Sequence, residues 1–379
     1  MNIGNTTSQG GAVKVGVIMD ETGPLAPLGT AAANTARMVV EEINAAGGLL
    51  GRSIALIVED SETNDGVAAA KAEKLVRDDR VAVVLGGIYS STRQAIKGPA
   101  VEQAKTLYIY PEQYEGQEAD PLIFCTGPVP AQQVEPFIPW LMRETGAKTF
   151  YLPSADYIWP HAMNEKVRQA AAANGGSIVG EEYFPVDHTD YRQTVERIMS
   201  SGVDVVFNTT VPPGVVPFLE QLAAAGFQKR GGRLVCTYFE ENLVGALPQA
   251  LVEGAYGCLD YYQTVADRFS TALLDRYNAR FPGASKFSAG SASTGMYRGL
   301  KLWEAAVREA GSFDQDAVIK ALDHAQLAEG PGGAAAMLPG QHHLRLNMYI
   351  AQVRNGALEV VKNLGPIDPK EQMIRAVGA

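Results

Sequence analysis

The sequence predicts an α/β fold made of two doubly wound lobes, and three observations lead to this prediction. The chain has 379 residues, which at about 150 residues per domain corresponds to two or three folding units. In the first half, short runs of Val, Ile and Leu alternate regularly with helix-forming segments, and the alternation restarts after residue 130. Because near-continuous apolar runs are typical of parallel strands covered on both faces, each set predicts a Rossmann-like parallel sheet with helices on both sides.

The first lobe is expected to begin with a strand at 13–19, a loop rich in Gly and Pro, and a helix at about 29–45. This helix should end at Gly47 and Gly48, because glycine readily adopts the left-handed conformation that closes a helix. The same alternation then predicts further strands at 54–58, 81–85 and 106–110, and further helices at 66–77 and 92–103.

The second lobe repeats this pattern, and a helix-rich segment follows it. Its predicted strands are 149–152, 177–183, 204–207 and 233–236, and its predicted helices are 134–144, 162–174, 191–199 and 215–225. The later helices are expected at 268–281, 291–310 and 315–322. A last pair of strands, 345–353 and 358–362, is separated by Asn355-Gly356, a strong hairpin signal, and is expected to form antiparallel edge strands.

The helix-rich segment is too small for a third domain, so we expect it to complete the first lobe while the hairpin returns to the second. The predicted division is 13–127 plus 260–335 for lobe 1, 128–259 plus 336–379 for lobe 2, and a flexible N-terminal segment at 1–12. The chain would then cross between lobes near 126–130, 257–262 and 333–341. Crossings of this kind form a three-segment hinge with a ligand cleft between the lobes.

Charge and composition exclude several classes of function. The net charge of −10, with no basic cluster longer than two residues, argues against a nucleic acid partner. No apolar stretch approaches the ~20 residues of a membrane span. The three cysteines (Cys125, Cys236 and Cys258) are too far apart for a metal or redox motif, and the five histidines form no metal signature, so neither metal nor cofactor is expected.

The loops that follow the predicted strands carry the candidate binding residues, because open parallel sheets bind ligands beyond the carboxyl ends of their strands. These loops are rich in hydroxyls, rings and carboxylates and contain almost no Lys or His. An arbitrary protein would use the same residues for core packing or as solvated loop acids. The candidates are Tyr89, Ser90, Tyr110, Glu112 and Gln113 in the first lobe, and Tyr157, Trp159, Thr209, Tyr238 and Glu240 in the second.

Two other interpretations of these loops are weaker. Gly86-Gly87 before a helix suits anion binding, but the P-loop lysine and the GxGxxG spacing are missing; a glycine-permitted turn with Ser91 as helix N-cap is the alternative. The sequence contains no GxSxG, HExxH or CxxC motif, and no histidine has an evident partner. We therefore expect a protein that is not an enzyme.

Several segments resemble a known family. Residues 22–25 (Thr-Gly-Pro-Leu) and 42–52 are similar to the N-terminal signature of the type I periplasmic solute-binding proteins of ABC transporters, the Leu/Ile/Val-binding class. Residues 87–93, 110–116 and 156–160 are similar to the branch of that class that binds urea and short-chain aliphatic amides. This branch includes a cytoplasmic amide sensor that regulates an amidase operon.

The resemblance implies roles for individual residues. Ser90 matches a hydroxyl that contacts the ligand from the first lobe, and Tyr110 and Glu112 match a loop that wraps it from the same side. Tyr157 matches a ring that closes over the ligand from the second lobe, next to Trp159, which stands where amide sensors more often have Tyr or Phe. A further position, Glu240, falls near the acid that holds the amino group in amino-acid-binding relatives.

Glu112 departs from the pattern, because amide- and urea-binding relatives usually carry an uncharged residue there. Two carboxylates repel each other strongly in a closed cleft of low dielectric constant. We therefore expect a solute rich in N–H groups with no carboxylate facing Glu112: an amide, a urea-like compound, a small amine or an amino-acid derivative.

The expected function is that of the substrate-binding protein of an ABC importer, which captures this solute by hinge closure. Its expected partners are the small-molecule ligand and an ABC permease in the membrane, and the protein itself is expected to be a monomer. The first twelve residues lack the apolar segment of a secretory signal, which suits either a cytoplasmic protein or a mature periplasmic chain. The resemblance favours the periplasm; the alternative is a cytoplasmic amide-sensing receptor that regulates an operon through a partner protein.

Overall fold

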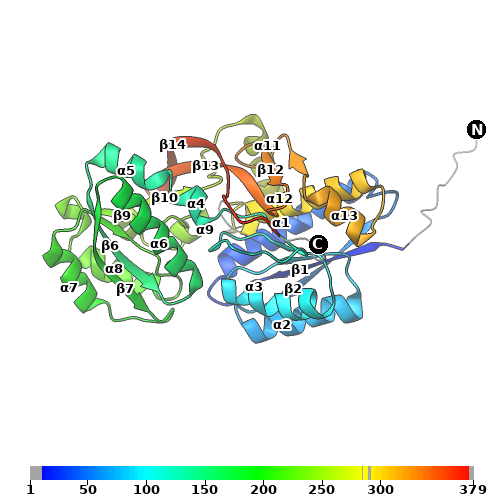
Figure 1. Cartoon of the computed structure of the whole chain (residues 1–379), viewed down its shortest axis with the longest axis horizontal. Helices are drawn as coiled ribbons and strands as arrows, with labels where there is room; N and C mark the ends of the chain where they lie inside the picture. Colours follow the sequence, from blue (N-terminus) through cyan, green and yellow to red (C-terminus); the bar gives the residue numbers. More distant parts are fainter. Residues whose placement is uncertain (1–10, 284, 289–291, 375–379) are drawn as a thin grey trace, which may run out of the picture.

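Figure 1 shows the computed structural model of the chain, which describes residues 11–283, 285–288 and 292–374. Two groups of helices and strands lie side by side, and the strands β13 and β14 lie where they meet. One hydrogen-bonded path of strands runs through both groups, in the order β2-β1-β3-β4-β5-β13-β10-β9-β8-β6-β7. The predicted flexible segment 1–12 lies outside the described residues except for its last two positions.

The first group consists of a five-stranded parallel sheet and of helices from the beginning and the end of the chain. Its strands are β1 (Val13–Met19), β2 (Ile54–Asp60), β3 (Val84–Gly86), β4 (Tyr108–Tyr110) and β5 (Ile123–Cys125). Its helices are α1 (Ala26–Ala45), α2 (Asp65–Lys74), α3 (Ser90–Lys97), α11 (Arg268–Arg280), α12 (Ala292–Ala310) and α13 (Gln315–Leu322).

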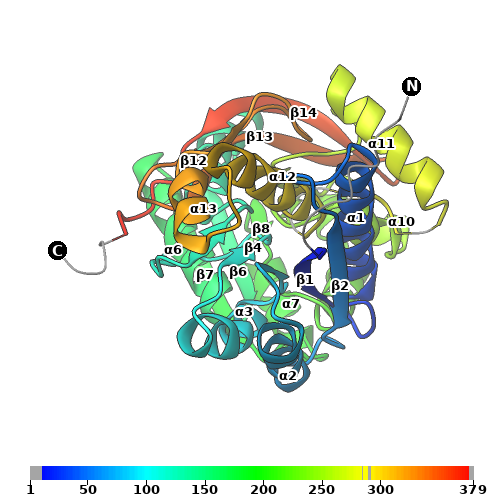
Figure 2. The same ribbon diagram turned by 90° about the vertical axis from the view of Figure 1, so that its right-hand side faces the viewer.

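Helices cover this sheet on both faces. Figure 2 shows α2 and α3 on one side of the strands, and α1 with α12 on the other. The predicted helices 66–77 and 92–103 continue beyond α2 and α3 as single π-helical turns, Leu75–Asp79 and Gly98–Gln103. The predicted helix 291–310 appears as α12, and residue 291 lies outside the described residues.

The second group has the same architecture. Its parallel strands are β6 (Thr149–Ala155), β7 (Ser177–Phe184), β8 (Val205–Phe207), β9 (Arg233–Val235) and β10 (Tyr256–Leu259). Its helices are α4 (Pro130–Gln133), α5 (Phe137–Thr145), α6 (Ile158–Ala173), α7 (Arg192–Ser201), α8 (Val215–Ala224), α9 (Glu241–Gly245) and α10 (Gln249–Val252).

The last strands of the chain join the two groups. β13 (His343–Arg354) pairs at its start with β5, through His343 and Cys125, and further along in antiparallel fashion with β10. β13 also pairs in antiparallel fashion with β12 (Ala335–Leu338) and with β14 (Ala357–Ile367). β12 in turn pairs with the two-residue β11 (Gln326–Leu327). The predicted hairpin turn is confirmed: Asn355 and Gly356 both have positive φ, 52° and 77°.

The prediction that both hairpin strands are edge strands is wrong for β13, which is bonded on several sides and lies inside the sheet path. The hairpin signal identifies the turn but carries no information about strands far away in sequence. The predicted helix 134–144 is also corrected, because Pro136 stands at the N-cap of α5 and separates it from α4.

The predicted fold class is confirmed: two doubly wound α/β lobes joined by several chain segments. The chain leaves the first sheet after β5, leaves the second after β10, and runs between the two along β13. The exact lobe boundaries given above stay a prediction.

Candidate ligand-binding site

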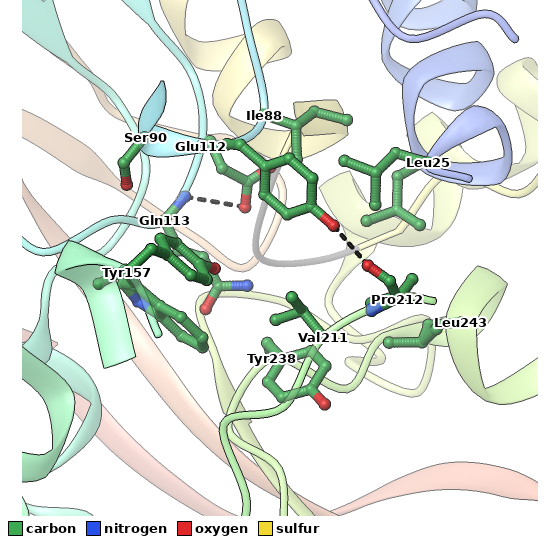
Figure 3. A pocket seen from close by; sticks show the side chains of 13 residues that line it. Leu25, Ile88, Ser90, Glu112, Gln113, Tyr157, Val211, Pro212, Tyr238 and Leu243 are labelled. Carbon is green, nitrogen blue, oxygen red and sulfur yellow. Dashed lines mark hydrogen bonds between the residues drawn. The ribbon is translucent and has the colours of Figure 1, made fainter. Parts of the chain in front are cut away.

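A pocket lies where the two lobes meet, beyond the carboxyl ends of their parallel strands (Figure 3). Its cavity volume is about 60 Å³. The lining consists of Leu25, Leu28, Ile88, Tyr89, Ser90, Glu112, Gln113, Tyr157, Trp159, Val211, Pro212, Tyr238 and Leu243.

The turn between β3 and α3 brings Tyr89 and Ser90 to the pocket. Gly86 has φ 130°, and a Cβ there would lie 1.9 Å from the carbonyl oxygen of Ile18 on β1, so the position requires glycine. This close approach explains the glycine pair without an anion. The prediction of Ser91 as N-cap is wrong, because the helix begins at Ser90 and the N-cap residue is Tyr89.

The loop after β4 supplies Glu112 and Gln113, both buried. The backbone N–H of Gln113 donates to Glu112 Oε1 (3.0 Å), and Gln133 Nε2 donates to Gln113 Oε1 (2.8 Å). Gly127 packs against this loop so closely that a Cβ would lie 2.2 Å from the Glu112 carbonyl carbon. The two polar residues are therefore held against the segment in which the chain leaves the first lobe.

Four aromatic rings form a continuous wall across both lobes. The centroid of Tyr89 lies 6.0 Å from that of Tyr157, Tyr157 lies 6.2 Å from Trp159, and Trp159 lies 5.8 Å from Tyr238. The Tyr89 hydroxyl of the first lobe donates to the Pro212 carbonyl of the second (2.7 Å; Figure 3). The lobes are thus in direct contact over the pocket.

Seven of the ten predicted site residues belong to this lining, and three lie behind it: Tyr110, Thr209 and Glu240. The Tyr110 hydroxyl donates to the Ile88 carbonyl (2.6 Å), and Thr209 donates to Ser154 (2.8 Å). Glu240 is the N-cap of α9 and accepts from the backbone of Asn242 and Leu243; burial raises the pKa of this carboxyl. These three residues lie behind the lining and hold neighbouring loops in place through hydrogen bonds.

Six apolar lining residues were not predicted. Val211 and Pro212 lie in the loop after β8, two and three residues after the predicted Thr209, so extending that loop would have found them. Leu25 and Ile88 also lie in loops after strands, but the prediction selected polar and aromatic residues in these loops and so left out these two apolar side chains. No sequence signal marks the remaining two, Leu28 on α1 and Leu243 on α9.

The lining carries one ionisable carboxyl group, Glu112, and among the described residues that form it none is Lys, Arg or His. Behind Ser90, whose hydroxyl donates to Glu115 (2.5 Å), lies a buried ionic cluster. Arg93 donates to Glu115 (2.7 Å) and lies 3.5 Å from Glu118, which also binds Lys97 (2.8 Å).

The described residues show no arrangement for metal binding: no group of three or more His, Cys, Asp or Glu side chains is placed to hold an ion. All three cysteines are buried, and burial raises the pKa of the Cys125 and Cys236 thiols to about 12, far from a reactive thiolate. Within the same ranges, no helix has both the length and the apolar character to cross a membrane.

Two doubly wound lobes that are joined by several chain segments, with a pocket between them, are an arrangement suited to binding a solute between the lobes. The chain belongs to the periplasmic binding protein family, whose family model matches residues 12–357. It is similar to Leu/Ile/Val-binding protein homolog 8 of Brucella melitensis, with 25% identity over 346 residues, 85% of this chain and 82% of that protein.

Solved structures share the fold over almost the whole chain. A solute-binding protein of an ABC transporter from R. palustris, in complex with benzoate, matches with a TM-score of 0.83 at 20% identity, covering 97% of this chain and 100% of that one. A branched-chain amino acid transporter substrate binding protein from Streptococcus pneumoniae, in complex with isoleucine, matches with a TM-score of 0.81 at 22% identity, covering 93% and 99%.

These comparisons confirm the predicted type I fold and the Leu/Ile/Val-binding-like class. The family is one of solute binders, not of enzymes, as the sequence predicts. The urea and amide branch stays a prediction.

Proposed function

We propose that this chain is the substrate-binding protein of an ABC importer and captures a small N–H-rich solute between its lobes by hinge closure. It would act in the periplasm and deliver the solute to a membrane permease. The observation that carries the proposal is the buried carboxyl group of Glu112, the one Asp or Glu side chain among the described residues that line the pocket at the lobe junction.

The polar groups of the lining suit N–H donors. Glu112 is an acceptor when ionised, and the Gln113 side chain next to it is held by Gln133 (2.8 Å). A ligand carboxylate placed here would meet the like charge of Glu112, and the described lining residues include no Lys, Arg or His, so this contact is unfavourable at low dielectric constant. The proposed ligands are therefore amides, urea-like compounds and small amines, in contrast to the benzoate and the isoleucine of the two solved relatives.

Besides the hydrogen bonds of Glu112 and Gln113, contacts with the aromatic wall contribute to the free energy of binding. The rings of Tyr157, Trp159 and Tyr238 come from the second lobe, and Tyr89 and Glu112 come from the first. A small solute reaches useful affinity only when most of its surface is buried, because even the best small ligands gain at most about 1.5 kcal/mol per heavy atom. Burial from both sides requires the lobes to close.

A thermal-unfolding screen of the purified chain with acetamide, urea, methylamine, isoleucine and benzoate tests the proposal. We expect acetamide, urea or methylamine to raise the melting temperature, since a ligand at about 100 times its Kd adds about 2.7 kcal/mol to the folded state. Stabilisation by isoleucine or benzoate alone would contradict the proposed ligand class.

A pair of matched variants assigns the effect to the pocket. Val211→Phe fills the pocket wall and should abolish the shift, because Val211 is a buried lining residue. Val179→Phe makes the same change at a position that is 43% exposed on β7 and should leave the shift intact. Loss of the shift in both variants, or in neither, would place the ligand elsewhere.

A further inference from the structure

The indole of Trp159 brings a buried hydrogen-bond donor to the pocket. We infer that the solute presents a carbonyl oxygen to this indole N–H, which makes it an amide or a urea-like compound and not an amine. This inference rests on the proposed function and narrows it from N–H-rich solutes in general to those that also carry an uncharged oxygen acceptor.

The first argument is the state of the Trp159 indole. The side chain lines the pocket and is only 4% exposed, and its Nε1 atom is buried without a hydrogen-bond acceptor in the described part of the chain. Leaving a buried N–H group without an acceptor costs free energy, and most such groups in native proteins have one. A solute in the pocket can supply the missing acceptor.

The second argument is that other donors of the lining are already in use. Three of its four hydroxyls, those of Tyr89, Ser90 and Tyr238, donate to oxygen atoms of the protein. The fourth belongs to Tyr157, which neighbours Trp159 in the aromatic wall. A solute oxygen that took the place of one of these acceptors would break a hydrogen bond within the protein, so the net gain would be small. Trp159 can donate to the solute without such a loss.

The third argument is the position of Trp159 in the first turn of α6. Tyr157 is the N-cap of this 16-residue helix, and its side chain makes no capping hydrogen bond. Pro160, also in the first turn, has no N–H group. The N-terminus of a helix carries a partial positive charge, which favours the partly negative oxygen of a carbonyl and disfavours an ammonium group.

A carbonyl at Trp159 would let the solute bind to both lobes. Trp159 belongs to the second lobe, whereas Glu112 and Gln113 come from the first. Figure 3 shows Glu112 and Tyr238, the ring that neighbours Trp159, on opposite sides of the pocket. An amide or a urea carries N–H donors and a carbonyl acceptor on the same carbon atom, so it can meet polar groups of both lobes at once. Such a solute would favour the closed arrangement of the lobes.

Nuclear magnetic resonance of the indole N–H groups tests the inference directly, because the chain has only three tryptophans, Trp140, Trp159 and Trp303. The signal that disappears in Trp159→Phe assigns the Trp159 resonance. Acetamide or urea should move this indole proton downfield and slow its exchange with water, because the proton enters a hydrogen bond. Methylamine, which offers no oxygen acceptor, should do neither.

A second measurement compares oxygen with sulfur in the same framework: acetamide with thioacetamide, and urea with thiourea. The N–H groups are kept, but sulfur accepts hydrogen bonds more weakly than oxygen. Isothermal titration of the full chain should show the oxygen compound of at least one pair binding about fivefold more tightly than its sulfur analogue.

The variant Trp159→Phe should reduce this preference to less than about twofold, because it keeps an aromatic ring and removes the donor. Trp140→Phe is the matched control: it makes the same change at a buried position of α5 outside the pocket lining and should leave the preference intact. The measurements on the unaltered chain stand even if Trp159→Phe fails to fold, since Trp140→Phe and Trp303→Phe then assign the signals by elimination.

The outcomes separate the inference from the proposed function. If acetamide and urea bind without moving the Trp159 signal, or bind no more tightly than their sulfur analogues, the inference is overturned and the proposed function stands. If acetate moves the signal as far as acetamide does, the acceptor is a carboxylate, and the proposed ligand class fails as well. If none of these probes binds, the inference fails, and the thermal-unfolding screen decides the proposed function.

Discussion

Asp20, the residue directly after β1, is an ionisable group placed where water does not reach. It is 1% exposed, and Gly29 of α1 packs on it so closely that a Cβ there would lie 2.1 Å from its carbonyl oxygen. Burial raises the pKa of Asp20 to about 6, an effect that the hydroxyls of Thr63 and Ser61 only partly offset. At neutral pH the folded protein therefore holds a carboxylate in an unfavourable place.

We predict that Asp20→Asn stabilises the protein at pH 8 and not at pH 4. The native state binds the Asp20 proton more tightly than the unfolded state, so the wild type loses stability as pH rises from about 4 to about 6. The gain of the variant at pH 8 should reach up to about 3 kcal/mol in the free energy of unfolding. Denaturant titration of both proteins at the two pH values measures it.

The comparison has to be made against the wild type at each pH, because His343 acts in the opposite direction. Burial lowers the pKa of His343 to about 4, so this side chain is neutral in the native state and stability is lost as pH falls from about 6.5 toward 4. The two groups partly cancel in the wild-type curve. An equal effect of Asp20→Asn at pH 4 and pH 8 would mean that the carboxyl titrates normally.

At the scale of elements, α12 holds all three segments that connect the lobes. Thr126, after β5, donates to the Gly295 carbonyl (2.8 Å), and Thr294 donates to Asp260, after β10 (2.7 Å). Arg298, on the same helix, donates to Asp260 and to the carbonyl of Pro331 (2.5 Å), just before β12. The start of one helix therefore fixes the connecting segments relative to the first lobe.

We predict that Arg298→Met lowers the free energy of unfolding by about 3–5 kcal/mol, because it removes one member of a buried ion pair, the Arg298 guanidinium that binds the fully buried Asp260. Arg308→Met, on the same helix, is the control: its guanidinium is half exposed and binds Glu304, so its loss should cost less than about 1 kcal/mol. Denaturant unfolding of both variants gives the comparison. Similar losses would show that the Asp260–Arg298 pair contributes no more than a surface pair.

At the scale of the whole molecule, the pocket is built from both lobes and closed by contacts between them. The Tyr89 hydroxyl reaches across to the Pro212 carbonyl (2.7 Å), and the Tyr89 and Tyr157 rings meet edge to face. Under the proposed mechanism, the lobes separate to admit a solute and close over it. The bound protein should therefore be more compact than the free one.

Small-angle X-ray scattering should show a smaller radius of gyration with a saturating ligand than without it. Tyr89→Phe keeps the ring and removes the hydrogen bond across the cleft, which contributes about 1 kcal/mol, so ligand affinity should fall about fivefold while the fold is unchanged. An identical radius with and without a saturating ligand would contradict closure as the binding step.

Local sequence determined much of this architecture. The strand at Val13–Met19 and the helix at Gln315–Leu322 were predicted with the observed bounds, because apolar runs and capping residues act over a few neighbouring positions. The short strands β5 and β10 were missed, although β3, β4, β8 and β9, which have three residues each, were predicted. In the site, the loops after strands identified the polar and aromatic residues, while the apolar lining carried no distinguishing signal.

The sequence by itself determined the two α/β lobes and most of the loops that line the pocket, because these follow from local patterns of apolar residues and turns, and its resemblance to known segments indicated the family. Only the tertiary structure decided which loop residues line the pocket and which support it: Tyr110, Thr209 and Glu240 differ from their lining neighbours solely in where packing turns their side chains. It also decided that β13 runs inside the sheet, joining the lobes. Pairing between strands that lie far apart in the sequence depends on contacts that no local pattern encodes.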